Sequence, residues 1–404
     1  MSAGILQGLR CVEVSAFVAA PLGGMTLAQL GADVIRIDPP QGGLEYRRWP
    51  VTADGTSLFW AGLNKSKRSV AIDIATPQGR ELAQALITAP GDDAGILLTN
   101  FPPRGWLEFE SLKKRCADLI QLTIQGDRNG GSAVDYTVNP RMGLPYLTGP
   151  KDGESPVNHV LPAWDLITGQ MAAVGLLAAE RHRRRTGEGQ HIKLALEDVA
   201  LAALGHLGLI AEAQLGGERP RYGNDLFGAF GRDFATRDGE RIMVVGLTLR
   251  QWKALCAATG IGERIVALAA KLGVNFDYEG ERFRARDAIA EFVGPWVATR
   301  SLAEVAAVFD AQSVCWGRYQ SVKRLVDSDS ACSELNPMFK TVQQPGVGPV
   351  LAPAIPLDFG VGRAPAQPAP RLGAHTAEVL ATLLGLTVSE IGRLQAQGVV
   401  GIPA

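Results

Sequence analysis

Asp165 is the side chain in this sequence whose context best suits covalent chemistry. It stands directly before apolar residues at helical spacing, so a helix is expected to begin at or near it. A carboxylate in that place can simply cap the helix. It can also face a cleft and attack an activated carbonyl carbon as a nucleophile. The two roles are compatible, and the residues alone leave both open.

Two basic loops could bind a phosphorylated ligand. Residues 64–69 read NKSKRS before one expected strand, and residues 100–105 read NFPPRG after another. Loops at the carboxyl ends of strands are where open α/β sheets bind ligands. Cations beside Asn and Phe101 suit a phosphate with an adenine ring. For either loop taken alone, a solvated surface loop is the simpler interpretation.

Other catalytic and binding motifs find little support. The turn after the first expected strand reads VAAPLGG, which is not the G-x-G-x-x-G of a dinucleotide site. Its glycines could equally serve close helix–strand packing. Asp38 ends the second strand as a dinucleotide site would require, but Arg36 on that strand suits a phosphate better. His159 is a possible acid or base, although a single His is more often packed or solvated. No zinc or serine-hydrolase motif is present, so no metal is expected.

The elements that must position these residues alternate between strand and helix. Strands are expected at residues 10–14, 33–38, 69–74, 94–100 and 119–124, and helices at 25–30 and 77–87, with a loop at 19–24. A long helix follows from near Asp165 to the turn at 186–189. This alternation predicts an α/β fold with a doubly wound sheet. Residues 216–231 are rich in glycine and indicate a linker, after which a smaller α/β pattern begins.

Composition indicates an ordinary globular enzyme. The 404 residues carry a formal net charge of -1, which gives no bulk attraction to nucleic acid or to an anionic membrane. The most apolar stretch, residues 194–215, contains four titratable side chains, so a buried helix is expected there rather than a membrane span. Five widely spaced cysteines and the lack of a signal peptide favour a reducing, cytoplasmic location.

Several segments together resemble family III CoA-transferases. Residues 18–37 are similar to the opening of that family, and the loops at 64–69 and 100–105 resemble two of its conserved loops. Asp165 with Gly169, and the sequence RRTGEGQ at 184–190, resemble its nucleophile region and the turn that follows. Residues 370–380, PRLGAHTAEVL, resemble its C-terminal signature. The similarity extends over nearly the whole chain.

The resemblance implies a definite architecture. A large Rossmann-like, doubly wound domain would be built from residues 1–215 and 336–404, with a linker and a smaller α/β domain at 216–335. It also implies a homodimer of two interlocked subunits. The family's glycine-rich lid has its nearest match at residues 228–231.

The resemblance also implies roles for individual residues. Asp165 would be the catalytic nucleophile, and CoA, as part of the acyl-CoA substrate, would be the only cofactor. The family's CoA contacts carry over to Val18, Ala19, Arg36, Leu63, Asn64, Asn100, Phe101, Arg104 and Tyr136. The Lys that accompanies the last contact in the family is absent here.

Stretches at 15–27, 136–140, 158–165 and 228–234 are most similar to a family member that moves CoA between the C1 and C4 carboxyls of one dicarboxylic acid. For such a reaction, Arg47 and Arg48 are candidates to hold the idle carboxylate, unless one of them simply faces solvent. Three alternatives remain: CoA transfer to an external acid, α-methylacyl-CoA racemisation, and CoA or nucleotide binding without catalysis. The racemase alternative is weakened because the family's His-Asp pair reads Val134-Asp135 here.

Overall fold

The computed structural model describes residues 4–403 and divides into two compact units. The first contains the chain up to residue 142, residues 160–214 and the chain from residue 329 onward; the second contains residues 143–159 and 215–328. These bounds differ from the sequence prediction, which places residues 143–159 in the large domain and extends the small domain to 335. Arg221 explains the first difference, since its guanidinium donates to the carbonyls of Pro145, Tyr146, Gly153 and Ser155.

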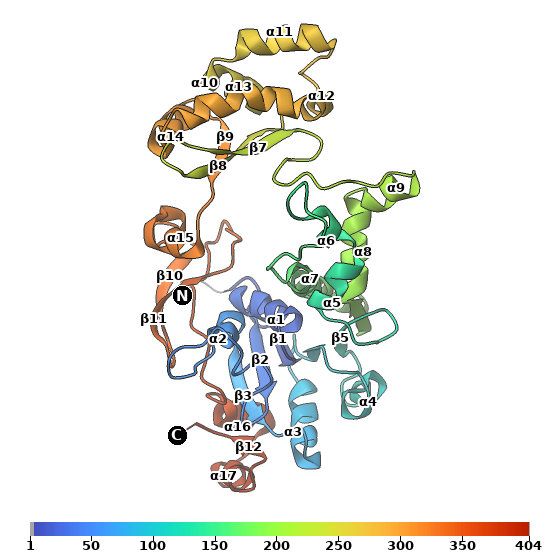
Figure 1. The fold of residues 1–404 in the computed structure, drawn as a ribbon. Helices are drawn as coiled ribbons and strands as arrows, with labels where there is room; N and C mark the ends of the chain where they lie inside the picture. The colour runs from blue at the N-terminus through green and yellow to red at the C-terminus, as the bar shows by residue number, and fades with distance from the viewer. Residues whose placement is uncertain (1–3, 404) are drawn as a thin grey trace. The chain divides into compact units, whose positions relative to one another are not determined.

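A seven-stranded sheet organises the first unit (Figure 1). Its strand order is β12-β3-β2-β1-β4-β5-β6, and all neighbours are parallel except β12 and β3. The strands are β1 Arg10–Val14, β2 Asp33–Asp38, β3 Arg68–Ile72, β4 Ile96–Thr99, β5 Ile120–Gln125, β6 His191–Ala195 and β12 Val400–Gly401. The order reverses between β1 and β4, which makes the crevice beyond their carboxyl ends the expected ligand site.

Helices cover both faces of this sheet, which is why its strands read as nearly continuous apolar runs. Alternate side chains of each strand enter opposite cores: Val12 packs with Leu86 and Val379, whereas Cys11 packs with Leu27 and Leu176. The covering helices are α1 Ala19–Gln29, α3 Pro77–Ile87, α7 Ala163–Thr186, α16 Thr376–Leu384 and α17 Val388–Ala396. The expected doubly wound α/β fold is therefore confirmed.

Helix α1 begins six residues before the helix predicted at 25–30, so the predicted loop at 19–24 is wrong. Pro21 does not prevent this, because a helix tolerates proline in its first turn. The two glycines serve packing: a Cβ at Gly24 would overlap the carboxylate of Glu13 on β1, and one at Gly23 would lie 3.0 Å from the carbonyl of Gly169 on α7. The packing interpretation of these glycines thus holds.

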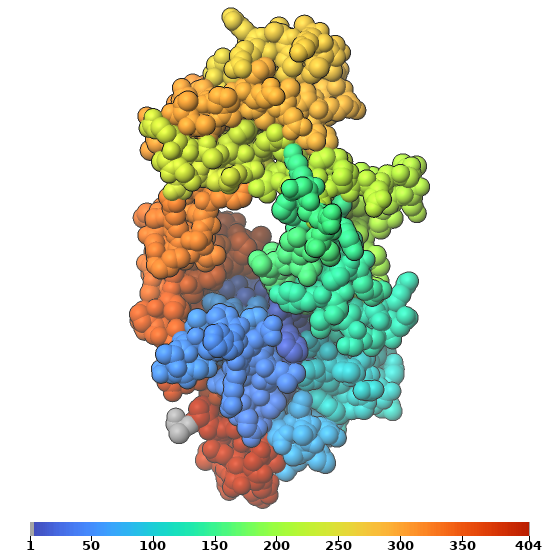
Figure 2. Space-filling model, in the orientation of Figure 1, coloured from blue at the N-terminus to red at the C-terminus, as the bar shows by residue number. Residues whose placement is uncertain are grey.

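The C-terminal segment completes the large unit. The N–H of Ala71 on β3 donates to Thr376 Oγ1 and that of Gly373 to Ser69 Oγ, across more than 300 residues of chain. In the space-filling view the red C-terminal segment lies against the blue N-terminal segment (Figure 2). The remaining α-helices and strands of this unit are α2 Leu58–Leu63, α4 Phe109–Lys113, α5 Asp135–Arg141, α8 Leu196–His206, α9 Leu209–Gln214, and the hairpin of β10 Phe339–Gln344 and β11 Gly348–Pro353.

The second unit has its own core around Phe230, Ile242, Trp252, Ile289 and Phe309. An antiparallel sheet of order β7-β8-β9 lies at its centre. Its elements are α6 Leu144–Leu147, β7 Phe230–Ala235, β8 Arg241–Gly246, α10 Leu249–Thr259, α11 Gly262–Leu272, α12 Glu279–Arg284, α13 Arg286–Ala298, α14 Leu302–Ala311, β9 Cys315–Arg318 and α15 Val322–Ser328. Across residues 4–403, no helix has the length and apolar character needed to span a bilayer.

Candidate active site

A cavity of about 620 Å³ lies at the carboxyl edge of the large sheet, where the strand order reverses. The loops that follow β1, β4 and β5 converge on it, as the switch-point rule predicts. Its lining includes Ala16–Ala19, Leu44, Arg48, Phe59, residues 100–103, residues 123–126, residues 130–136, Pro162, Asp165 and Leu196. All of these residues belong to the first unit.

Asp165 lines this cavity from the first turn of α7. The residue that precedes the helix is Pro162, which gives no side-chain cap, and Asp165 itself is the third helical residue. The capping interpretation of Asp165 is therefore wrong, and its carboxylate is left available to the cavity.

Asp135 supplies the cap that α7 needs. Its Oδ2 accepts hydrogen bonds from the backbone N–H of Trp164 at 2.7 Å and of Asp165 at 3.1 Å. An anion at a helix N-terminus satisfies donors that would otherwise lack partners and suits the helix dipole. Asp135 is only 1% exposed, starts α5 and also lines the cavity.

The environment raises the pKa of Asp165 to about 7 from an ordinary value of 3.8. Burial is the main cause because it disfavours the charged carboxylate, and the negative charge of Asp135 adds to it. Among the described residues, Asp165 has no ion pair with a cation. At neutral pH this carboxyl group therefore exists in both its protonated and its ionised form.

Close packing of α1 against α7 brings Val18 and Ala19 to the cavity beside Asp165. A Cβ at Gly169 would lie 2.7 Å from the carbonyl of Ala19, so only glycine allows this approach. Phe17, just before α1, has a left-handed backbone with a φ of 66°, which is strained for a residue with a side chain. The turn from β1 into α1 is thus shaped to bring its backbone to the cavity wall.

Asn100 ties together the two loops that flank the switch point. Its Nδ2 donates to the carbonyl of Ala16 at 2.7 Å, and its Oδ1 accepts from the N–H of Ala16 at 3.0 Å. The neighbouring Phe101 lines the cavity with Asn100. Both residues lie where CoA contacts were expected, but the amide of Asn100 is already used in holding the loops.

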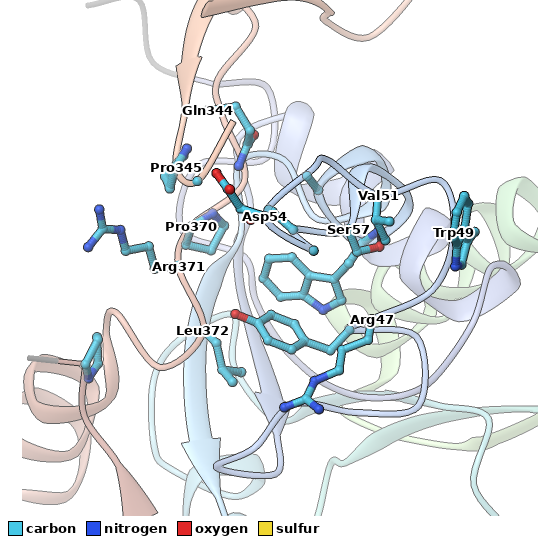
Figure 3. A pocket seen from close by; sticks show the side chains of 17 residues that line it. Arg47, Trp49, Val51, Asp54, Ser57, Gln344, Pro345, Pro370, Arg371 and Leu372 are labelled. Atoms are coloured by element: carbon cyan, nitrogen blue, oxygen red, sulfur yellow. Dashed lines mark hydrogen bonds between the residues drawn. The ribbon is translucent and has the colours of Figure 1, made fainter. Parts of the chain in front are cut away.

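The adjacent residues Arg47 and Arg48 line different cavities. Arg48 lines the Asp165 cavity, with its guanidinium over the ring of Phe59 at 5.2 Å from the ring centroid. Arg47 lines a second cavity of about 730 Å³, together with Asp54, Gln344 and Arg371 (Figure 3). The structure therefore does not bring both arginines to the Asp165 cavity, and the prediction that an arginine holds the idle carboxylate is kept for Arg48.

Arg36 and Asn64, which were expected to contact CoA, are fully enclosed. Arg36 is 1% exposed and binds the carboxylates of Glu13, Asp38 and Glu45. Asn64 is buried, donates to the carbonyl of Trp60 and accepts from Lys67 at 2.8 Å. A strand and a loop that looked suited to phosphate instead form an internal ion-pair cluster, so neither side chain borders the Asp165 cavity in this structure.

Three further predicted contacts lie in different settings. Tyr136 is 52% exposed and lines the cavity. Arg104 is exposed but lies outside the cavity lining, and Leu63 is half-buried and likewise outside it. The structure thus brings together Asp165, Val18, Ala19, Asn100, Phe101, Tyr136 and Arg48, and leaves Arg36, Arg47, Leu63, Asn64 and Arg104 outside.

Asp135 is the functional candidate that the sequence interpretation missed. In the sequence it stands out only as the partner of an absent histidine. The usable signal was the lack of a good capping residue at Pro162, because a long helix that begins in the interior needs its first N–H groups satisfied. The sequence offered no way to tell that a residue 30 positions earlier would fill that role.

Comparisons with known proteins agree on one protein family. The model of CoA-transferase family III matches residues 6–376. Over 403 residues the sequence is 61% identical to 2-methylfumaryl-CoA isomerase of Chloroflexus aurantiacus, covering 99% of this chain and 98% of that protein. It is 30% identical over 317 residues to succinyl-CoA:mesaconate CoA-transferase of Haloarcula hispanica, covering 73% and 76% of the two chains. A CAIB/BAIF family protein from Brucella suis has a similar structure, with a TM-score of 0.75, 26% identity and coverage of 94% and 99%.

Proposed function

This chain belongs to CoA-transferase family III and is an enzyme of that kind, and from this premise we propose that it moves CoA between the C1 and C4 carboxyls of 2-methylfumarate. It would thus act as a 2-methylfumaryl-CoA isomerase. The observation that carries the proposal is the carboxylate of Asp165 on a cavity at the switch point of the sheet. The strong similarity to an isomerase of that name supports the choice of substrate.

The first half of the proposed reaction opens the C1 thioester. The ionised Asp165 attacks the C1 carbonyl carbon, and the C–S bond breaks to release CoA thiolate and leave a mixed anhydride. The thiolate then attacks the aspartyl carbonyl of the anhydride. This step releases 2-methylfumarate with both carboxylates free, and it leaves a CoA thioester on Asp165.

The second half repeats these steps in the opposite order at C4. The C4 carboxylate attacks the aspartyl thioester, the thiolate leaves, and a second anhydride forms. The thiolate attacks the C4 carbonyl, which produces the C4 thioester and regenerates the Asp165 carboxylate. Atoms and charge balance without water, an external acid or any cofactor beyond the CoA of the substrate.

A pKa of about 7 suits Asp165 to this work. Burial removes part of the hydration that makes an ordinary carboxylate a weak nucleophile, while a useful fraction stays ionised at neutral pH. Exclusion of water also protects the anhydrides from hydrolysis. The reaction is therefore expected to need the ionised form and to slow as pH falls through 7.

Arg48 is the proposed partner of the idle carboxylate, because it is the arginine that lines the Asp165 cavity. A guanidinium can hold a carboxylate through two parallel hydrogen bonds. The first turn of α1 offers backbone N–H groups as candidate donors to the tetrahedral oxyanions. Val18 and Ala19, at that turn, are also the proposed backbone contacts of CoA.

Mass spectrometry of the intact protein tests the covalent step. Protein incubated with the C1 thioester of 2-methylfumarate and quenched in acid is expected to carry a CoA or acyl adduct. Peptide mapping should place the adduct on Asp165, and Asp165→Ala should carry none. An adduct on another residue, or full activity of Asp165→Ala, would refute the proposed nucleophile.

Isotope labelling separates the proposed isomerisation from transfer to an external acid, the activity that the Haloarcula relative's name describes. Labelled free 2-methylfumarate is added to the reaction mixture. An intramolecular reaction leaves the thioester pool unlabelled, whereas label in the C4 thioester would favour an intermolecular transferase.

The other two alternatives have less support. A racemase needs a second base at Cα, and among the described residues that line the cavity there is no histidine. Deuterium uptake at Cα from heavy water would revive that alternative. A binding module without catalysis is wrong, because the chain is an enzyme of CoA-transferase family III.

The assembly and location remain part of the proposal. We expect an interlocked homodimer, and the exposed apolar residues Ile167, Met171 and Val174 along α7 are consistent with a covered face. Light scattering after gel filtration would give twice the mass of the chain. The five cysteines are free, which fits the proposed reducing, cytoplasmic location.

A further inference from the structure

Asp135 is the second carboxylate of the Asp165 cavity, and only half of it is engaged by the protein. Its Oδ2 accepts from the N–H groups of Trp164 and Asp165. Its Oδ1 is buried and, within residues 4–403, has no hydrogen-bond partner. A buried carboxylate oxygen without a donor is costly, and a protein keeps one where it has a use.

The backbone contact makes Asp135 a direct neighbour of the nucleophile. The N–H that it accepts at 3.1 Å belongs to Asp165 itself, so the two side chains are fixed relative to each other through one residue's backbone. The indole of Trp164 strengthens this link by donating to Asn139 Oδ1 on α5 at 3.2 Å. Movement of α5 would therefore move the start of α7 and the nucleophile with it.

Few other charges can influence Asp165. The main contacts of α7 are with α1, α5, α8, β5 and β6, and α1 and β5 carry no charged residue. The titratable or charged residues on the other three are Asp135, Tyr136, Arg141, His191, Lys193, Glu197, Asp198 and His206. Arg141 pairs with Glu197 at 2.6 Å, and His191 bonds Thr123 at 3.0 Å. Of all these groups, Asp135 and Tyr136 line the cavity, where Arg48 joins them.

We propose that Asp135 is a positioning residue of this site, which fixes the start of α7 and sets the charge state of Asp165 by holding a second carboxylate beside it. The inference rests on the proposed function only in giving Asp165 the role of nucleophile. Like charges in one site favour the protonated form of one partner. The raised pKa of Asp165, to which Asp135 contributes, agrees with this geometry.

Two substitutions separate the structural role from the electrostatic role. In Asp135→Asn the amide oxygen can still accept both N–H groups, and the new NH₂ replaces Oδ1, which meets no donor in the described residues. The helix start is thus kept and the charge is lost. In Asp135→Ala the oxygen that accepts both N–H groups and the charge are lost, so α7 begins with unsatisfied N–H groups.

The experiment measures kcat/KM for the C1 thioester between pH 5 and 9, with melting temperature as the control for folding. For Asp135→Asn we expect an unchanged melting temperature and an acid limb shifted to lower pH by roughly one unit. When kcat/KM at pH 6 is divided by the plateau value of the same protein, the ratio should be roughly fivefold higher in Asp135→Asn than in the wild type. For Asp135→Ala we expect a lower melting temperature and a plateau reduced roughly tenfold or more.

A second measurement does not depend on activity. The carboxyl signal of Asp165 can be assigned in ¹³C-labelled protein by its absence from Asp165→Asn, and then titrated in wild type and in Asp135→Asn. A lower titration midpoint of Asp165 in Asp135→Asn supports the inference. It does so even if the wild type is inactive on the C1 thioester, because inactivity would refute only the proposed function. Superimposable titrations, or an Asp135→Ala variant with wild-type stability and pH profile, would overturn the inference.

Discussion

Two groups of buried charges lie along the same edge of the large sheet, and they are built in opposite ways. Around Arg36, each of the carboxylates of Glu13, Asp38 and Glu45 contacts Arg36 or Lys67. In the Asp165 cavity, two carboxylates lie together and neither forms an ion pair with a cation in the described residues. The first group is enclosed by protein, whereas the second borders an open cavity.

The contrast separates charges that hold the fold from charges that can react. A fully paired buried charge has no capacity left for a ligand, and removing its partner is costly. An unpaired carboxylate held near its own pKa can change its protonation state and bond to carbon. Residue type alone does not distinguish them, because Arg36 and Arg48 are equally suited to bind an anion.

The largest expected effect comes from breaking the paired group. Arg36→Met should lower the free energy of unfolding by about 3–5 kcal/mol, because three buried carboxylates lose a shared partner. The matched control is Arg115→Met, which breaks an exposed ion pair with Glu81 and should cost less than about 1 kcal/mol. Urea denaturation measures both. Similar losses in the two variants would contradict the distinction drawn between buried and exposed pairs.

Removing the unpaired charge of Asp165 should instead raise the free energy of unfolding. The pKa of Asp165 is raised on folding from 3.8 to about 7, so its contribution to stability is full below pH 4 and is lost as pH rises through 7. Asp165→Asn abolishes this loss and should raise the free energy of unfolding at pH 8 by about 2–4 kcal/mol. The gain should be smaller at pH 5. Urea midpoints at both pH values test this; a variant less stable than wild type at pH 8 would show that the carboxylate is favourably paired after all.

Asn100 offers an intermediate case, since it is satisfied by the fold and also borders the cavity. Asn100→Ala removes both hydrogen bonds to Ala16 and should cost about 1–2 kcal/mol of stability, with a several-fold higher KM for the acyl-CoA. Asn100→Asp keeps the acceptor for the N–H of Ala16 but loses the donor to its carbonyl, so it should also be impaired. Denaturation and steady-state kinetics measure the two effects. Wild-type values in both variants would mean that the loops do not depend on this bridge.

The smallest expected effects distinguish the neighbouring residues Arg47 and Arg48. Arg48→Met should raise KM roughly tenfold, because the idle carboxylate loses a charge-assisted partner, with little change in stability. Arg47→Met, which alters the second cavity, should leave KM within about twofold. Initial rates over a range of substrate concentrations test both. The reverse order of effects would assign the carboxylate to Arg47.

The sequence predicted the strands of the large sheet and the bounds of α3 well, because buried parallel strands are short apolar runs and α3 begins with a proline, but it placed the start of α1 six residues late. It also predicted that the loop of Phe101 follows a strand, which is the edge of the sheet where the cavity lies. The sequence did not distinguish a side chain that is buried and paired from one that is open to a ligand. Nothing in the local pattern distinguishes Arg36, which is enclosed by Glu13 and Glu45, from an arginine open to a phosphate. Asp135 was missed for the same reason, since its role depends on a contact made across 30 residues of chain.

The closure of the large unit by residues 373–401 has a consequence for biosynthesis. Until this segment leaves the ribosome, the edge of β3 lacks its partner β12, and the apolar side chains that pack with Val379 and Leu394 remain uncovered. Nascent chains are therefore expected to be prone to aggregate through that edge and to engage chaperones until translation ends.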